Sequence, residues 1–337
     1  MRAVAVPRLG PIGKIVIKDF PIPVCGPDDV LIKVVSAGVN PVDWKESEGA
    51  LEQFFGQYPD FWVPGLDAAG VVQTTGKAVS NFRQGDRVVA ISDRARGHSG
   101  TFAEYVRVPE CLVAKVPPSI SLDEAASIPC AGLTGFQALF RAGKGRLGHG
   151  DAVFIHGGSG GVGSWTVQSA KARGLRVAAS CSAANVDYVR SLGADIALDH
   201  ATGELVQRIR QWQPDGVAAV IDCVSGETLP DALDMLRPGG RLISIPTLTQ
   251  DGDVEGDTAL AKQRGFSKIM AFVEYDKVGE ELAEILDMMV RRAVQCPPLT
   301  IYPFSAAAAA IERMKVGKVR GKIILRIADD IPTKAPT

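Results

Sequence analysis

An alternation of strand-length apolar runs with helix-length segments, which begins at residue 151, constrains the fold more than any other feature of this sequence. Parallel strands joined by helices form a doubly wound sheet, because each connecting helix packs back onto one face of that sheet. The spacing predicts helices over 162–173 and 186–192. The strands are expected at 152–156, 176–181, 195–199, 217–224 and 241–245, with a sixth at 267–273.

The first third of the chain has a different pattern. Short β-like runs at 30–35, 70–73, 86–91 and 102–106 are separated by Gly, Pro and Asp. Many short strands with frequent turn residues predict a compact, mainly β domain, such as a partly open barrel. A length of 337 residues also exceeds one ordinary core, so we expect two domains.

The last part of the chain is expected to return to the β domain. An amphipathic helix is predicted over 278–294, the alanine run 306–310 begins another helix, and 322–326 is β-like. The α/β domain is therefore predicted to be inserted within the mainly β domain.

Composition gives no support for several classes of partner. The formal net charge of −1 and the absence of long runs of like charge give no electrostatic reason to expect nucleic acid or an anionic membrane. No stretch reaches the roughly 20 consecutive apolar residues that span a bilayer. The six cysteines are scattered without a C-x-x-C pair, which is typical of a reducing compartment, so we expect a soluble cytoplasmic protein.

The strongest chemical signal is a glycine-rich turn between the strand at 152–156 and the helix that follows it. Its glycines satisfy G-x-G-x-x-G, which in this context predicts a dinucleotide cofactor, whereas the alternative is a purely structural turn. The pyrophosphate of such a cofactor approaches backbone N–H groups at a helix N-terminus, where a Cβ atom would collide with it. The residues expected to form this site are Gly158, Ser159, Gly160, Gly161, Val162 and Gly163.

The end of the second strand of this domain bears on the choice between NAD and NADP. NAD-selective proteins usually place Asp or Glu there, on the ribose hydroxyl. In this chain the strand ends in Ser180, Cys181 and Ser182, so no carboxylate would repel a 2′-phosphate. The nearest downstream cation is Arg190, so no clear positive clamp is present. The sequence favours NADPH and leaves NADH possible.

Landmarks along almost the whole chain resemble the medium-chain dehydrogenase/reductase superfamily, and within it the zinc-independent quinone oxidoreductases, the zeta-crystallin-like group. The resemblance implies a GroES-like catalytic domain made of residues 1–124 and 275–337, with a Rossmann cofactor domain inserted at 125–274. It also implies a homodimer formed by edge-to-edge pairing of the segment 267–273. The landmarks are AGVNPVD at 37–43, PGLDAAG at 64–70, GTFAEY at 100–105, AASIP at 125–129, AGLT at 131–134 and GKIIL at 321–325.

The resemblance implies roles for individual residues. Asn40 and Lys45 are expected near the nicotinamide, with Thr134 behind it, whereas Ser180, Ser182 and Asn185 are expected around the adenosine ribose. Many relatives have a lysine for the 2′-phosphate where this chain has Asn185. His200 is expected against the cofactor, the alternative being a solvent-facing histidine at a strand end. The nicotinamide pocket is expected to be lined by Val224, Ser244, Ile245, Pro246, Thr247 and Phe272.

The zinc-binding positions of the superfamily are not retained. Asn40 stands in place of a cysteine ligand, and Leu66 and Asp67 stand in place of a His–Glu pair. His98, the only histidine in the first domain, is expected in an exposed loop. Catalytic zinc generally requires three protein ligands, so we expect no bound metal.

Without a metal to polarise an alcohol oxygen, quinones and α,β-unsaturated carbonyl compounds are the expected hydride acceptors, because these substrates themselves stabilise the incoming charge. The proton is assigned to Asp43, Lys45 or solvent. The aromatic residues Tyr58, Phe61 and Trp62 are expected either to border the substrate cleft or to serve in ordinary packing. Two alternatives stay open: an enoyl or 2-alkenal reductase acting on thioesters or aldehydes, and an NADPH-binding redox sensor of low turnover.

Overall fold

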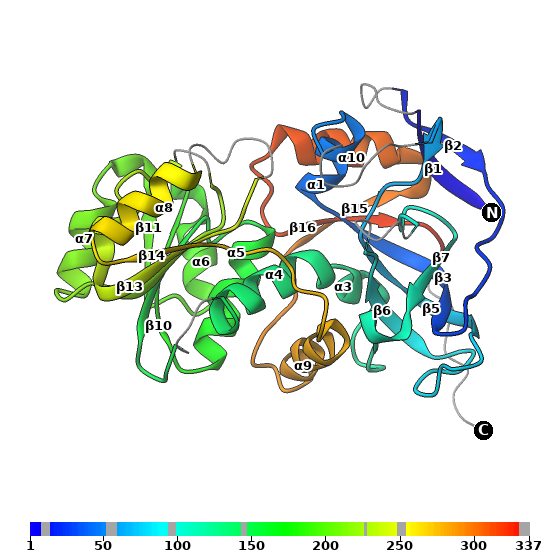
Figure 1. Cartoon of the computed structure of the whole chain (residues 1–337), viewed down its shortest axis with the longest axis horizontal. Coiled ribbons are helices and arrows are strands. Elements are labelled where there is room, and N and C mark those ends of the chain that lie inside the picture. The colour runs from blue at the N-terminus through cyan, green and yellow to red at the C-terminus, as the bar shows by residue number, and fades with distance from the viewer. Residues whose placement is uncertain are drawn as a thin grey trace.

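Two lobes lie side by side along the long axis of the molecule, one around a parallel sheet and the other around a largely antiparallel sheet (Figure 1). The computed structural model describes residues 1–7, 14–51, 59–93, 99–142, 147–225, 228–247 and 254–329. None of the helices in these ranges is long and apolar enough to cross a membrane.

The first lobe contains a six-stranded parallel sheet in the order β11-β10-β9-β12-β13-β14. The chain passes from β9 to one side and then returns to β12 on its other side, which is the crossover of a doubly wound fold. The predicted α/β architecture is therefore confirmed. The strands are β9 (Ala152–His156), β10 (Arg176–Cys181), β11 (Ile196–Asp199), β12 (Val217–Asp222), β13 (Leu236–Ser244) and β14 (Ser267–Met270).

Burial of β9 on both faces explains why its sequence is apolar up to the closing His156. Val153 and Ile155 contribute to one core cluster together with Val167 of α5. Phe154 points the other way, into a separate cluster with Ile209 of α7. Helices cover both faces of the sheet as a result. They are α5 (Gly161–Ala172), α6 (Val186–Ser191), α7 (Leu205–Trp212) and α8 (Val254–Gln263).

The second lobe is built on a seven-stranded sheet in the order β15-β16-β3-β5-β6-β8, with β7 also pairing with β3. Strand β16 returns from the end of the chain and pairs antiparallel with β3, with Ile324 opposite Gly38. A smaller sheet of order β2-β1-β4 flanks it. The strands are β1 (Arg2–Pro7), β2 (Val16–Asp19), β3 (Asp29–Val39), β4 (Phe61–Trp62), β5 (Asp67–Thr75), β6 (Arg87–Ile91), β7 (Tyr105–Pro109), β8 (Val113–Lys115), β15 (Leu299–Pro303) and β16 (Lys322–Arg326).

Several boundaries differ from those expected, and β13, for example, begins at Leu236 rather than at 241. Strand β7 begins at Tyr105 rather than at 102, because the preceding residues bend and contribute only an isolated bridge between Ala103 and Ala3. Strand β14 ends at Met270 rather than at 273. Helix α9 (Val278–Val290) stops before 294, since Arg292 takes a left-handed conformation with φ 58°, which terminates helices.

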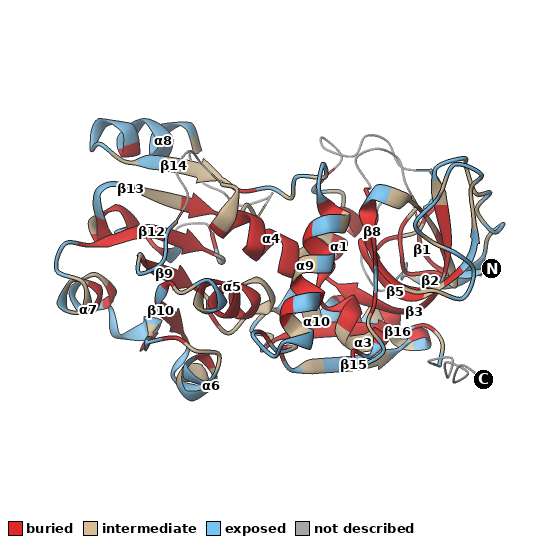
Figure 2. Ribbon diagram, turned by 90° about the horizontal axis from the view of Figure 1, so that it is seen from below, coloured by how far each residue is buried: buried red, intermediate tan, exposed pale blue. Residues whose placement is uncertain are grey.

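The two lobes share a hydrophobic core. Helix α4 (Pro129–Phe140) runs between them and is buried along most of its length (Figure 2). Phe136 of α4 belongs to one apolar cluster with Trp165 of α5 and Ile285 of α9. This packing fixes the glycine turn of the first lobe against the strands of the second. The remaining helices of the second lobe are α1 (Pro41–Ser47), α3 (Leu122–Ala126) and α10 (Ala307–Val316).

Candidate active site

The glycine turn joins β9 to the N-terminus of α5, as the sequence predicts. Gly157 has φ 81°, a backbone conformation that residues other than glycine rarely adopt. Gly160 is the N-cap of α5. A Cβ atom on Gly163 would lie 2.1 Å from the carbonyl oxygen of Gly157. A Cβ atom on Gly160 would have no protein atom closer than 3.5 Å. Gly163 is thus required by close packing of the turn, whereas the space beside Gly160 remains available to a phosphate.

Ser180 lies underneath the turn rather than beside a ligand site. It is fully buried in β10, with its Oγ 2.6 Å from Nδ1 of His156 and within 3.4 Å of the Gly157 backbone nitrogen. Burial lowers the pKa of His156, and Asp222 opposes this shift. His156 and Ser180 therefore form a buried polar support for the turn, and nothing in the sequence alone paired them.

Three of the residues expected near the cofactor do meet at the carboxyl end of β10. Asn185 donates hydrogen bonds from Nδ2 to Ser159 Oγ at 3.2 Å and to Ser182 Oγ at 3.1 Å. Ser182 is exposed and Asn185 is half-buried. The amide thus links the glycine turn to the end of the second strand, where an adenosine ribose is normally held.

A cation that the sequence analysis does not identify reaches the same place. Arg320, from the segment that precedes β16, donates from Nε to Asn185 Oδ1 at 2.6 Å and from Nη2 to the Ala184 carbonyl at 3.0 Å. Its guanidinium also lies 5.5 Å from the ring centre of Tyr188. Arg320 is 135 residues from Asn185 in the chain, so no local spacing pattern indicates this contact.

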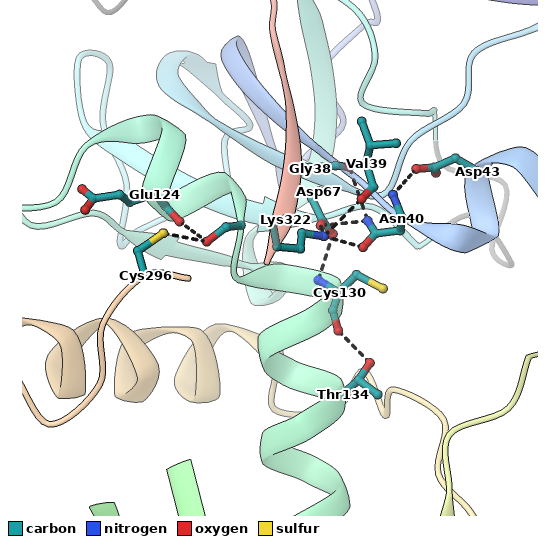
Figure 3. A network of polar contacts seen from close by, with 11 residues as sticks. Gly38, Val39, Asn40, Asp43, Asp67, Glu124, Cys130, Thr134, Cys296 and Lys322 are labelled. Carbon is teal, nitrogen blue, oxygen red and sulfur yellow. Dashed lines mark hydrogen bonds and ion pairs between the residues drawn. The ribbon is translucent and has the colours of Figure 1, made fainter. Parts of the chain in front are cut away.

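A buried polar cluster lies where α1, β3, β5 and β16 meet (Figure 3). Lys322 Nζ donates to Asn40 Oδ1 at 2.6 Å and lies 3.4 Å from Asp67 Oδ2. Asn40 Nδ2 donates to the same Asp67 oxygen at 2.9 Å, and the backbone N–H of Cys130 donates to the other at 2.8 Å. The exposed fractions of Asn40, Asp67 and Lys322 are 3%, 0% and 2%. Burial raises the pKa of Asp67, and the charge of Lys322 opposes that rise.

Asp43 of α1 contacts this cluster through Asn40. Its Oδ2 accepts a hydrogen bond from the Asn40 backbone N–H at 2.7 Å, whereas Oδ1 is buried with no hydrogen-bond partner in the described part of the chain. Burial raises the pKa of Asp43 well above its ordinary value, and the charges of Asp67 and Glu46 add to the rise. The carboxyl is completely buried, so it is screened from any ligand in the cleft.

Lys45 and Thr134 are also largely buried. Lys45 Nζ donates to the Thr247 carbonyl, which connects α1 to the segment that follows β13. Thr134 donates from Oγ1 to the carbonyl of Cys130, one turn earlier in α4, at 2.6 Å. The structure therefore places Lys45 at the junction of the two lobes, and its position near the nicotinamide stays a prediction.

The other predicted pocket residues are at the carboxyl ends of the strands but differ in exposure. Val224 and Phe272 are 42% and 54% exposed, Ser244 is buried, and His200 is exposed. Ile245 accepts a hydrogen bond from Ser225 through its carbonyl. The half-buried members of this group are Ile245, Pro246 and Thr247.

The aromatic residues expected at the cleft separate into two kinds. Trp62 is buried and packs with Val6 in a small apolar cluster, so it serves in ordinary packing. Phe61 is partly exposed, with the ammonium of Lys18 3.9 Å from the centre of its ring. Tyr58 and His98 lie outside the described residues.

The donor set at Asn40 and Asp67 does not suit zinc. Among the residues that the structure describes, no group of three or more His, Cys, Asp or Glu side chains is placed to hold a metal ion. The oxygens that a metal would need are bonded instead to the Lys322 ammonium, whose charge would repel a divalent cation. The cluster of Asn40, Asp67 and Lys322 therefore does not fit a zinc ion.

A doubly wound sheet with a glycine turn, joined through a shared core to a GroES-like sheet, defines a medium-chain dehydrogenase/reductase. Comparison with known families agrees: residues 26–118 match the alcohol dehydrogenase GroES-like domain, and residues 192–325 match the zinc-binding dehydrogenase domain. The chain belongs to the quinone oxidoreductase group of this superfamily, and it is an oxidoreductase.

Individual relatives cover most of the chain. The chloroplast envelope quinone oxidoreductase homolog of Arabidopsis thaliana is 31% identical, over 90% of this chain and 92% of that protein. The NADPH-dependent alkenal/one oxidoreductase of the same plant is also 31% identical, over 88% of this chain and 72% of that protein. The solved quinone oxidoreductase from Coxiella burnetii is 29% identical and superposes with a TM-score of 0.86, covering 97% of this chain and 99% of that one.

Proposed function

We propose that the protein transfers a hydride from NADPH to quinones or α,β-unsaturated carbonyl compounds, and that it does so without zinc. The observation that carries this proposal is the Lys322 ammonium at the position where zinc-dependent members of the superfamily hold their metal. The similarity to a quinone oxidoreductase homolog and to an alkenal/one oxidoreductase supports the same substrate classes.

The choice of substrate depends on how the acceptor stabilises the negative charge that it gains with the hydride. A nicotinamide cofactor supplies the hydride, and the protein supplies binding, orientation and electrostatics. Lys322 is 2% exposed, so its ammonium cannot contact a substrate oxygen directly and does not replace a metal as a Lewis acid. Acceptors that delocalise the arriving negative charge over their own conjugated oxygen need no such acid. Saturated aldehydes and ketones lack that property.

The residues of the chain hold and orient the reactants. Gly160, at the N-terminus of α5, leaves room for the pyrophosphate, and the helix dipole favours negative charge there. Asn40 is fixed on both sides by Asp67 and Lys322, so the floor of the nicotinamide site is rigid. Because Asp43 is buried and Lys45 is bonded to Thr247, we infer that solvent supplies the proton that completes the reduction.

A panel of acceptors tests the proposal. NADPH oxidation is followed with a 1,4-benzoquinone, a 2-alkenal, a trans-2-enoyl thioester, and a saturated aldehyde of the same length. We expect turnover with the quinone or the 2-alkenal and none with the saturated aldehyde. Turnover restricted to the thioester would favour an enoyl reductase. Tight NADPH binding without turnover on any acceptor would favour the redox sensor and contradict the proposal.

We further propose a homodimer in a reducing, cytoplasmic environment. Strand β14 stands at the edge of the parallel sheet, where its outer side can pair with a second copy. Sedimentation equilibrium is expected to give twice the 35.7 kDa mass of the chain, and a monomer would contradict the pairing.

A further inference from the structure

Arg320 is an exposed arginine held in one orientation by uncharged partners. Its two hydrogen bonds go to an amide oxygen of Asn185 and to a peptide carbonyl of Ala184, and its guanidinium stacks near Tyr188. Neither hydrogen-bond acceptor carries a formal charge. No ion pair joins Arg320 to a carboxylate in the part of the chain that the structure describes.

The guanidinium also retains donors. Arginine has five N–H groups in a planar fork that suits phosphate oxygens. The bonds to Asn185 and Ala184 use Nε and Nη2, and Nη1 makes no hydrogen bond among the described residues. Arg320 is therefore oriented before any ligand arrives, with positive charge and at least one terminal nitrogen still available.

The position of this charge corresponds to one part of a dinucleotide. The pyrophosphate belongs at the glycine turn, and the adenosine ribose belongs at the end of the second strand. Asn185 bridges these two places through Ser159 and Ser182, and Arg320 is bonded to the same amide. A group attached to the 2′-oxygen of the ribose would therefore lie next to Arg320.

The other cation near this strand end is less suited to the role. Arg190 is 61% exposed and lies 3.6 Å from Asp187, so its charge is partly compensated by a carboxylate of its own helix. Arg320 comes from the other lobe, and the neighbouring Gly321 donates its N–H to the Ser159 carbonyl at 3.1 Å. A ligand held by Arg320 would contact both lobes at once.

We propose that Arg320 recognises the 2′-phosphate of NADPH and is the residue that sets the preference for NADPH over NADH. This inference rests on the proposed function, since it assumes that the protein binds NADPH. It assigns the phosphate contact to the segment before β16 rather than to the cofactor lobe, so that the phosphate helps to hold the two lobes together.

Titration calorimetry on the full chain tests the inference with four ligands: NADPH, NADH, 2′,5′-ADP and 5′-AMP. The variants are Arg320→Gln, which removes the charge, Arg320→Lys, which keeps it, and Arg190→Gln as the matched control. A charge-assisted contact is worth roughly a tenfold to hundredfold change in affinity. We expect Arg320→Gln to weaken NADPH and 2′,5′-ADP by that factor while NADH and 5′-AMP change less than about twofold. Arg320→Lys should recover part of the loss, and Arg190→Gln should change none of the four affinities.

The outcomes separate this inference from the proposed function. If the unmodified protein prefers NADPH and Arg320→Gln keeps that preference, or weakens NADPH and NADH equally, the role of Arg320 is wrong and NADPH dependence stands. If the unmodified protein binds NADH as tightly as NADPH, the proposed cofactor is wrong, and the role of Arg320 falls with it. A preference that Arg320→Gln abolishes and Arg320→Lys partly restores supports both.

Discussion

Arg320 and Lys322 are separated in the chain by Gly321 alone, yet the structure uses their charges in opposite ways. Arg320 is exposed and faces Asn185 of the cofactor lobe, whereas Lys322 is 2% exposed and faces Asn40 and Asp67 inside the catalytic lobe. Gly321 makes the change of direction possible with φ 73°, and a Cβ atom there would lie 2.1 Å from the Pro298 carbonyl. One short segment thus contributes to both ends of the proposed cofactor site.

Burial explains why the two charges should have different consequences. Removing one partner of a buried ion pair leaves the other charge without compensation, which costs several kcal/mol. An exposed arginine with neutral partners contributes little to folding, so its charge remains available to a ligand. We therefore expect substitution of Lys322 to affect stability first and substitution of Arg320 to affect ligand binding first.

The largest expected effect concerns Lys322. Lys322→Met should lower the free energy of unfolding by about 3–5 kcal/mol, because Asp67 would stay buried without its ammonium partner. Urea unfolding measures this change. Lys318→Met, on an exposed side chain of the same segment, is the control and should stay within about 0.5 kcal/mol.

A double variant makes this prediction sharper. Lys322→Met combined with Asp67→Asn removes both charges and should recover part of the lost stability, since no charge is then left unpaired. If Lys322→Met unfolds at the same urea concentration as the unmodified protein, the Lys322 charge does not stabilise the fold, and the contrast with Arg320 is wrong.

Gly160→Val is expected to abolish binding of both cofactors, with affinities lowered by about a hundredfold or more through collision with the pyrophosphate. This result would contrast with Arg320→Gln, which should weaken the binding of NADPH, the cofactor with a 2′-phosphate, and leave NADH binding almost unchanged. Gly163→Val is no equivalent test, because its Cβ atom would meet the Gly157 carbonyl and disturb the turn itself. Calorimetry with NADPH and NADH measures the affinities, and circular dichroism verifies the fold. Unchanged affinity in a folded Gly160→Val protein would exclude the turn as the phosphate site.

The buried Asp43 predicts a pH dependence. Because its pKa is raised in the folded state, the folded protein binds more protons than the unfolded chain, and the stability due to Asp43 is lost as the pH rises above its unfolded pKa of about 3.9. The loss reaches at most about 1.4 kcal/mol per pH unit and ends above the folded pKa.

The charges of Asp67, Glu46 and Lys322 also influence the pKa of Asp43. Comparison with Asp43→Asn therefore isolates the part of the pH dependence that comes from the Asp43 carboxyl. The difference in unfolding free energy, unmodified protein minus variant, should decrease as the pH rises above the unfolded pKa of an aspartate, about 3.9. A difference that is constant with pH would show that Asp43 is ionised in the folded protein.

A smaller effect is expected at the end of β10. A carboxylate at Ser182, which is exposed and bonded to Asn185, would repel the 2′-phosphate, so Ser182→Asp should shift the preference towards NADH by roughly tenfold. Ser180→Asp would bury a charge next to His156 and test stability rather than selectivity. Dissociation constants for both cofactors decide the prediction, and an unchanged NADPH/NADH ratio in Ser182→Asp would place the ribose elsewhere.

The parts of the site that the sequence predicts are those encoded locally. The glycine turn and strands β9 and β10 are recognisable because each lies within one continuous segment. Alternation along a strand puts Ser180 and Ser182 on one face, but β10 ends at Cys181, so Ser182 leaves the sheet and only Ser180 stays buried. The spacing of residues in the sequence does not locate the end of a strand with a precision of one residue.

The contacts that the sequence does not predict join distant segments. Lys322 is 282 residues from Asn40, and Arg320 is 135 residues from Asn185. The sequence identifies Asn40 and Asp67 as unsuitable zinc ligands. It does not identify Lys322 as the cation that binds their oxygens. The antiparallel pairing of β16 with β3 brings that cation to them, and this pairing depends on the tertiary fold.

Hydride transfer to a quinone or a 2-alkenal without zinc can be tested on a single sample of the protein. The purified protein is dialysed against a chelator, its zinc content is determined by elemental analysis, and NADPH-dependent turnover of a quinone or 2-alkenal is measured on the same sample. We expect unchanged turnover with far less than one zinc per chain. Turnover that disappears with the metal and returns when zinc is added would contradict zinc-independent hydride transfer.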